Sequence, residues 1–211
     1  AHMVGFYVPM HTATRLATKV LARIREVNET AHICFFGLYA PMNESYLRSL
    51  GVDTVLGGEF EQGLLDVYEL SIKERREIDG RTIPTNSLKR QKFKVPDRTG
   101  LPTLDHYARL RVTPDLSRTV GYTEASRGCR HLCRHCPVVP VYNGKFVVVP
   151  ADIVLEDIRR QVDCGAEHIT FGDPDFFNGP AHSLRIVRQM HHEFPGLSYD
   201  VTIKIEHLRK H

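Results

Sequence analysis

Apolar positions in the first 75 residues alternate between short continuous runs and a helical period. Continuous runs predict buried parallel strands at 31–37 and 52–58. Apolar residues at helical spacing predict helices at 11–27, 43–50 and 62–72. Repeated β-α units joined by short turns favour an open, doubly wound parallel sheet, so we expect a Rossmann-like α/β domain over residues 4–75.

The N-terminus offers little room for an opening strand. Residues 1–3 are interpreted as a cloning remnant, and the chain reaches the first predicted helix a few residues later. We therefore expect the first strand of the sheet to be missing or incomplete.

The middle of the chain, residues 76–118, loses this periodicity. Four prolines, two glycines and many charges predict an ordered linker there. From residue 119 the β-α pattern returns, together with a short extended segment at 145–149. It predicts strands at 119–126, 167–171 and 197–205, and helices at 150–163 and 181–193.

The charge balance narrows the classes of partner. With 28 basic and 25 acidic residues the net charge is +3, too balanced to indicate nucleic-acid binding. The basic stretch 89–94 is interpreted as a solvated loop face. No apolar run approaches the ~18–20 residues of a membrane span, and no signal peptide is found, so we expect a cytoplasmic protein.

Three of the five cysteines lie within eight residues, as Cys129, Cys133 and Cys136, with the spacing C-x3-C-x2-C. Clustered thiols in an intracellular protein indicate a metal rather than a disulfide scaffold. Three thiolates can converge on an iron–sulfur cubane, whose fourth iron would then be open to a substrate. Because the loop follows a predicted strand, it is expected at the C-terminal end of that strand, where β/α barrels place their active sites.

The residues around the cysteines suit such a cluster. Gly128 lets the chain turn tightly out of the strand. Arg127, Arg130 and Arg134 favour the thiolate form and offset the negative charge of a cluster.

Zinc is the alternative metal, bound by the three cysteines with His131 or His135. A structural zinc knuckle normally stabilises a domain with little core of its own, whereas this loop is attached to a β-α array that should fold by burial. The alternative function is accordingly a zinc-stabilised module that binds nucleic acid or protein. A third is an electron-transfer protein that uses the cluster alone.

The cysteine loop and its approach, residues 121–129 (GYTEASRGC), resemble the radical S-adenosylmethionine (SAM) superfamily. The resemblance is to the subgroup with an N-terminal cobalamin-binding-like, Rossmann-type domain. Residues 52–61 are similar to the end of that domain. Residues 169–178 are similar to the F-x-D-x-x-F segment that follows the second barrel strand in this subgroup. The similarity covers most of the chain except the middle of the linker.

The resemblance implies a set of ligands. Cys129, Cys133 and Cys136 would hold a [4Fe–4S] cluster, and SAM would chelate the fourth iron. The residues implied to contact SAM are His135, Gly172, Asp173, Lys204 and Glu206.

Two parts of this set have a simpler interpretation. Asp173 and Asp175 could instead cap the following turn. Lys204 and Glu206, expected to share one face of the third strand, could instead form a strand-end ion pair.

The resemblance also implies a reaction class. The reduced cluster would cleave SAM reductively and generate a radical for C–S, C–C or C–As chemistry, such as transfer of a methyl or 3-amino-3-carboxypropyl group. The expected partners are a small-molecule or peptide substrate and an electron donor of the flavodoxin or ferredoxin type.

The sequence departs from the family in three ways. His135 replaces the usual larger aromatic residue before the third cysteine. The D-x-H-x-x-G cobalamin signature is absent, which leaves cobalamin binding open. Residues 119–211 supply three β/α units of a barrel that usually has six, so we expect a C-terminally truncated chain with the N-terminal half of the barrel.

Overall fold

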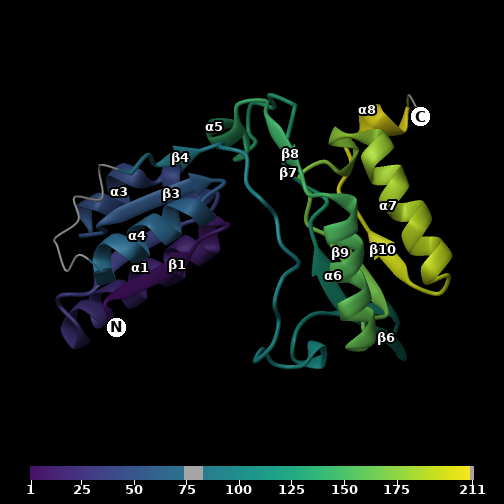
Figure 1. The fold of residues 1–211 in the computed structure, drawn as a ribbon, viewed down its shortest axis with the longest axis horizontal. Coiled ribbons are helices and arrows are strands. Elements are labelled where there is room, and N and C mark those ends of the chain that lie inside the picture. The colour runs from purple at the N-terminus through teal and green to yellow at the C-terminus, as the bar shows by residue number, and fades with distance from the viewer. Residues whose placement is uncertain (74–82, 210–211) are drawn as a thin grey trace. The chain divides into compact units, whose positions relative to one another are not determined.

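The computed structural model describes residues 1–73 and 83–209, and these form two compact units (Figure 1). The first unit contains residues 1–91 together with 131–143, and the second contains residues 92–130 and the chain from residue 144 onward. The expected boundary between domain and linker at residue 75 and the last two residues of the chain lie outside the described residues.

The first unit is built on a parallel sheet of four strands in the order β1-β2-β3-β4. Its strands are β1 (Met3–Tyr7), β2 (His32–Phe36), β3 (Thr54–Gly58) and β4 (Asn86–Ser87). Its helices are α1 (His11–Val27), α2 (Tyr39–Met42), α3 (Glu44–Ser49), α4 (Glu61–Lys73) and α5 (Val139–Tyr142). The doubly wound α/β architecture predicted from the pattern is therefore confirmed.

Strand β1 corrects the expectation that the first strand is missing or incomplete. It pairs with β2 along its full length, from Met3 opposite His32 to Tyr7 opposite Phe36. Val4 and Phe6 pack against the core, whereas Gly5 between them is exposed. This alternation spans only five residues directly before a helix, so it is too short to stand out in the sequence.

The core of the first unit lies on both faces of its sheet. On one face Ile33, Phe35 and Val55 pack with Leu21 of α1 and Leu47 of α3. On the other face, the core cluster contains Cys34, Leu56 and Val67 of α4. Cys34 is fully buried here as a small hydrophobe, and burial raises the pKa of its thiol to about 12.

The second unit has a four-stranded sheet in the order β10-β9-β6-β5. Strands β6 (Leu116–Thr123), β9 (His168–Phe171) and β10 (Ser198–Asp200) are parallel, and β5 (Arg109–Thr113) pairs antiparallel with β6. A separate two-stranded ribbon joins β7 (Ser126–Gly128) to β8 (Phe146–Val148). The helical elements are η1 (Leu104–His106), α6 (Ala151–Asp163), η2 (Phe176–Asn178), α7 (Pro180–Glu193) and α8 (Ile205–Leu208).

Helices α6 and α7 pack together and against the sheet of the second unit (Figure 1). Ile158 of α6 and Ile186 of α7 are fully buried, as is Ile169 of β9 between them. The apolar face of each helix therefore covers one face of the sheet and leaves the carboxyl ends of the strands to the connecting loops. Among the described residues, none of the helices combines the length and apolar character needed to cross a bilayer.

The predicted ordered linker contributes β4 to the first sheet and β5 to the second. One predicted strand boundary is corrected. The strand predicted at 197–205 ends at Asp200. Beyond it the Thr202 carbonyl accepts the Phe176 N–H at 2.8 Å, so the chain pairs with the η2 segment instead of β9.

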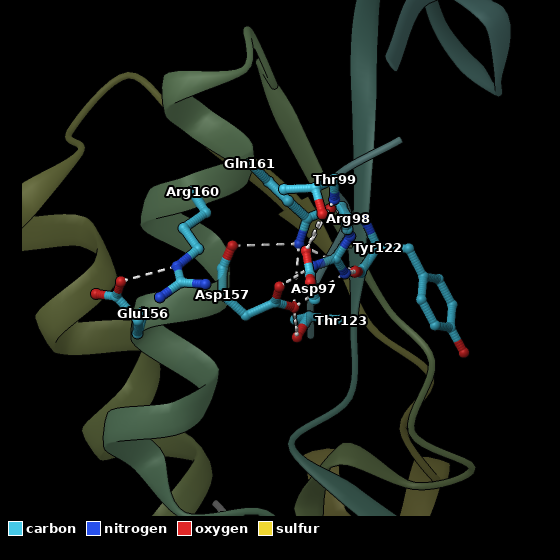
Figure 2. A network of polar contacts seen from close by, with 9 residues as sticks. All are labelled: Asp97, Arg98, Thr99, Tyr122, Thr123, Glu156, Asp157, Arg160 and Gln161. Atoms are coloured by element: carbon cyan, nitrogen blue, oxygen red, sulfur yellow. Dashed lines mark hydrogen bonds and ion pairs between the residues drawn. The ribbon is translucent and has the colours of Figure 1, made fainter. Parts of the chain in front are cut away.

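An ion pair between Arg98 and the buried carboxylate of Asp157 fastens the chain around Arg98 to α6 within the second unit (Figure 2). The Arg98 guanidinium donates to both carboxylate oxygens of Asp157 on α6 and to the Tyr122 carbonyl at 3.1 Å. Thr123 donates to the same carboxylate at 2.9 Å, and Gln161 at 3.2 Å. Asp157 is thus compensated although only 2% of its surface is exposed.

Candidate iron–sulfur and SAM site

The cysteine loop begins where β7 ends. Gly128, the last residue of β7, has φ 76°, a left-handed conformation that a side chain would strain, and Cys129 follows it. Cys129 is buried in the second unit. Cys133 is exposed and Cys136 half-buried in the first unit, where the Cys136 N–H donates to the Cys133 carbonyl at 3.2 Å. The structure places none of the three in a disulfide, which is compatible with the proposed ligand role.

The segment that leads to the loop is held by Asp173, which follows β9. The Ala125 N–H donates to Asp173 Oδ2 at 2.8 Å, and the Ser126 hydroxyl donates to Oδ1 at 2.6 Å. Burial raises the pKa of Asp173 to about 6, although these hydrogen bonds lower it in part. The carboxyl group of Asp173 thus holds the backbone that leads into the cysteine loop. Its contact with SAM stays a prediction.

The backbone on either side of Cys129 is bonded to Asn178, the last residue of η2. Asn178 Nδ2 donates to the Gly128 carbonyl at 2.9 Å, and the Arg130 N–H donates to Asn178 Oδ1 at 3.2 Å. Asn178 is buried, with 2% of its surface exposed. Its side chain therefore extends the backbone pairing by one step beyond the end of β7.

Asp175, at the start of the η2 turn, contacts both this turn and His207. Asp175 caps η2 by accepting the Phe177 N–H at 3.2 Å, as the turn-capping alternative predicted. His207 Nε2 of α8 lies 3.0 Å from Asp175 Oδ2, and Arg130 Nη2 lies 3.4 Å from His207 Nδ1. Since a guanidinium only donates, His207 Nδ1 is the acceptor in this contact, and Nε2 is the ring nitrogen that faces Asp175.

The other residues predicted to contact SAM are dispersed. His135 is exposed in the cysteine loop. Lys204 and Glu206 form an ion pair at 3.3 Å, at the start of α8 rather than on a strand. A Cβ at Gly172 would lie 1.7 Å from the hydroxyl of Tyr122, an exposed side chain that would have to move aside. The SAM-binding role of these residues stays a prediction.

The pattern of the sequence did not single out Asn178 or His207. Asn178 is the last residue of the segment 169–178 that resembles the superfamily, but the sequence does not predict its hydrogen bonds to the backbone around Cys129. His207 lies near the C-terminal end of the chain, and only the fold brings it to Asp175.

The carboxyl edge of the first sheet is filled by the chain itself. A Cβ at Gly57 would lie 2.1 Å from Pro41 Cγ, and one at Gly58 would lie 2.3 Å from the Ser87 carbonyl oxygen. Buried Glu59 follows, accepting the Tyr142 hydroxyl at 3.1 Å. The close packing of neighbouring segments therefore accounts for these glycines without a cofactor.

Comparison with known proteins places the fold. No family model matches the chain. Two solved structures of the radical SAM methyltransferase TsrM from Kitasatospora setae match it, each at 17% identity over 92% of this chain. The chain shares their fold. The TM-score is 0.73 for TsrM with tryptophan substrate and the SAM analogue aza-SAM, and 0.66 for TsrM with cobalamin and a [4Fe–4S] cluster. This chain spans 41% of the length of TsrM.

Proposed function

We propose that this chain supplies the cluster- and SAM-binding part of a radical SAM enzyme. The observation that supports this most strongly is the C-x3-C-x2-C loop, which follows β7 in a fold shared with TsrM. The proposed cluster ligands are Cys129, Cys133 and Cys136. At 17% identity the likeness extends to the fold, so the chemistry is inferred from the loop and not from the relative.

The donor set fits a [4Fe–4S] cluster with one open iron. The three proposed ligands are cysteines of one short loop, and the structure places none of them in a disulfide. Cys34 is excluded as a fourth ligand by its position in the core of the first unit, where burial keeps it protonated. Cys164 follows α6, far along the chain from the loop. Three protein ligands leave a coordination position for a substrate group.

The bound cluster would supply one electron for reductive cleavage of a C–S bond of SAM. The described residues around it hold the loop and balance charge. Arg127 pairs with Glu124 at 3.1 Å, and its guanidinium carbon lies 5.2 Å from the centroid of the Phe93 ring. These contacts hold the Arg127 guanidinium close to the start of the loop. Arg130 is likewise held, through its contact with His207.

The SAM-binding residues in this proposal are His135, Gly172, Asp173, Lys204 and Glu206. They supply an aromatic ring, a close backbone approach and charges of both signs, which suit an adenine, a ribose and the amino-acid end of SAM. Asp173 would reach SAM only from a carboxylate already bonded to Ala125 and Ser126.

Cobalamin has weaker support in this chain than the cluster. The D-x-H-x-x-G signature is absent from the sequence, and the glycines at the carboxyl edge of the first sheet are explained by Pro41 and Ser87. The described residues therefore add no support of their own for cobalamin, whose binding stays open, and no step of the proposed reaction passes through it. Methyl transfer and 3-amino-3-carboxypropyl transfer, to a small molecule or a peptide, both remain within the proposal, with a flavodoxin- or ferredoxin-type electron donor.

Anaerobic reconstitution tests the proposed function. We expect brown protein with about four irons per chain and, after reduction with dithionite, cleavage products of SAM detectable by mass spectrometry. Cys129→Ala should lose the cluster, whereas Cys164→Ala, an exposed cysteine outside the loop, should keep it. Colourless protein that holds one zinc per chain would contradict the proposal and favour the zinc-stabilised binding module.

A further inference from the structure

The two peptide groups that flank Cys129 are held by a single side chain. Asn178 donates to the carbonyl before Cys129 at 2.9 Å and accepts the N–H of the residue after it at 3.2 Å. Both Asn178 and Cys129 are buried. This is the donor and acceptor pair that a neighbouring strand would provide, supplied where β7 has no further strand partner in its ribbon.

We infer that Asn178 is a positioning residue for the cluster, which fixes the backbone of Cys129 and thereby the direction of its sulfur. The inference rests on the proposed function of the cysteine loop. It assigns to the η2 turn a task separate from binding SAM, namely to preorganise one of the three thiolate ligands.

The chemistry of the contact requires a carboxamide. An amide side chain offers a donor and an acceptor side by side, whereas an ionised carboxylate of the same shape would place an acceptor oxygen against the Gly128 carbonyl. A buried carbonyl that loses its donor costs more free energy than the hydrogen bond itself contributed. Cys129 should therefore sample open positions more often when Asn178 is replaced.

Asn178 can act in this way because it is itself fixed. Its N–H donates to the Asp175 carbonyl at 3.0 Å within η2, and Asp175 caps the same turn. Helix α7 starts at Pro180, two residues later, so the chain direction on the far side of Asn178 is also set. The clamp is thus rigid on the side of η2 and acts on a loop that enters it from β7.

Cluster ligands tuned in this way have measurable signatures. The reduction potential of an iron–sulfur cluster depends on hydrogen bonding and solvent exposure around its sulfurs. Loss of the clamp should therefore alter the electron paramagnetic resonance spectrum of the reduced cluster, its midpoint potential and the rate at which a chelator removes its iron.

The first experiment measures thiol reactivity in the metal-free protein. Iodoacetamide alkylation of Cys129 is followed by peptide mass spectrometry, with exposed Cys164 as the internal standard. Asn178→Ala should raise the ratio of Cys129 to Cys164 alkylation about tenfold, and Asn178→Asp should raise it as well. Two variants are used so that a fold defect in one of them leaves the other informative.

Ser183→Ala is the matched control. Ser183 is equally buried and donates to the Phe176 carbonyl of the same turn, but it makes no hydrogen bond to the cysteine loop. Its ratio should stay at the wild-type value. An unchanged ratio in both Asn178 variants, or an equal rise in Ser183→Ala, would overturn the inference.

The second experiment uses the reconstituted protein. Asn178→Ala should lose iron to a chelator about tenfold faster than Ser183→Ala, with altered g values. If the wild-type protein takes up no iron, the proposed function fails while the alkylation ratio still decides on the clamp. If the wild type holds a cluster and Asn178→Ala keeps its spectrum, potential and iron-release rate, the inference fails and the proposed function stands.

Discussion

Asp173 is a buried carboxyl group that supports the entry to the cysteine loop. Its oxygens accept hydrogen bonds from Ala125 and Ser126 at 2.8 and 2.6 Å. Desolvation nevertheless dominates, because it disfavours the charged form more than these donors stabilise it, and the pKa rises to about 6. The nearby Glu124 carboxylate acts in the same direction.

This raised pKa predicts a dependence of stability on pH. Between pH about 4 and 6 the folded protein binds the Asp173 proton more tightly than the unfolded chain does. The free energy of unfolding contributed by this group should therefore fall as pH rises through that interval, by on the order of 3 kcal/mol in total. Asp173→Asn should remove this part of the pH dependence, as measured by urea unfolding at pH 4.5 and 7. The same slope in wild type and variant would contradict the assignment.

At the scale of elements, Arg98 fastens its part of the chain to Asp157 of α6 (Figure 2). Arg98→Met should lower the free energy of unfolding by about 2–3 kcal/mol, because it leaves the buried Asp157 carboxylate without its counter-ion. The control is Arg160→Met on the same helix, where the ion pair with Glu156 is exposed and should matter by less than about 0.5 kcal/mol. Equal losses in urea unfolding would show that Arg98 is an ordinary surface residue.

Elements with strong periodicity could be predicted from the sequence. Helix α1 has the predicted bounds His11–Val27, and strand β9 differs from its prediction only by one residue at its start. Each buries enough apolar surface for its period to be visible along the chain. Strands β1 and β4 could not be predicted in this way, because they pair with residues distant in sequence. Strand β5 pairs with the adjacent β6, but all of its residues are exposed, so little burial marks it.

The candidate site was accessible to sequence reasoning only where residues are adjacent along the chain. The spacing of Cys129, Cys133 and Cys136 is visible in the sequence. The support of that loop comes from Asn178 and His207, which are 48 and 77 residues away from Arg130 and meet it through folding. No local pattern encodes such contacts, so the loop could be recognised while its anchors could not.

At the scale of the molecule, the first unit is discontinuous in sequence, since it takes up residues 131–143 after the chain has left it. The return segment ends in α5, which packs on α2 and β3. Val141 and Tyr142 are buried there, and the Tyr142 hydroxyl donates to buried Glu59. The segment that follows Cys136 is thus part of the core of this unit.

Tyr142→Phe tests that integration. Loss of the hydroxyl should cost the first unit about 1–2 kcal/mol, because Glu59 loses a donor inside the core. Native-state hydrogen exchange should speed up in β3 and stay unchanged in β9 of the second unit. Tyr68→Phe, at an exposed position on α4, is the control and should leave both strands unchanged. Equal acceleration in β3 and β9 would contradict the discontinuous unit.

Because the first unit is discontinuous, its two parts leave the ribosome at different times during synthesis. The last residue of its first part is Gln91, and its return segment ends at Asn143. At roughly 5–20 residues per second, a ribosome adds the intervening chain in about 3–10 seconds. Throughout that interval the edge of β3 that α5 will cover stays open to water and to chaperones. Cys133 and Cys136 lie in that return segment, so the ribosome adds them in the same few seconds in which the chain of the first unit is completed.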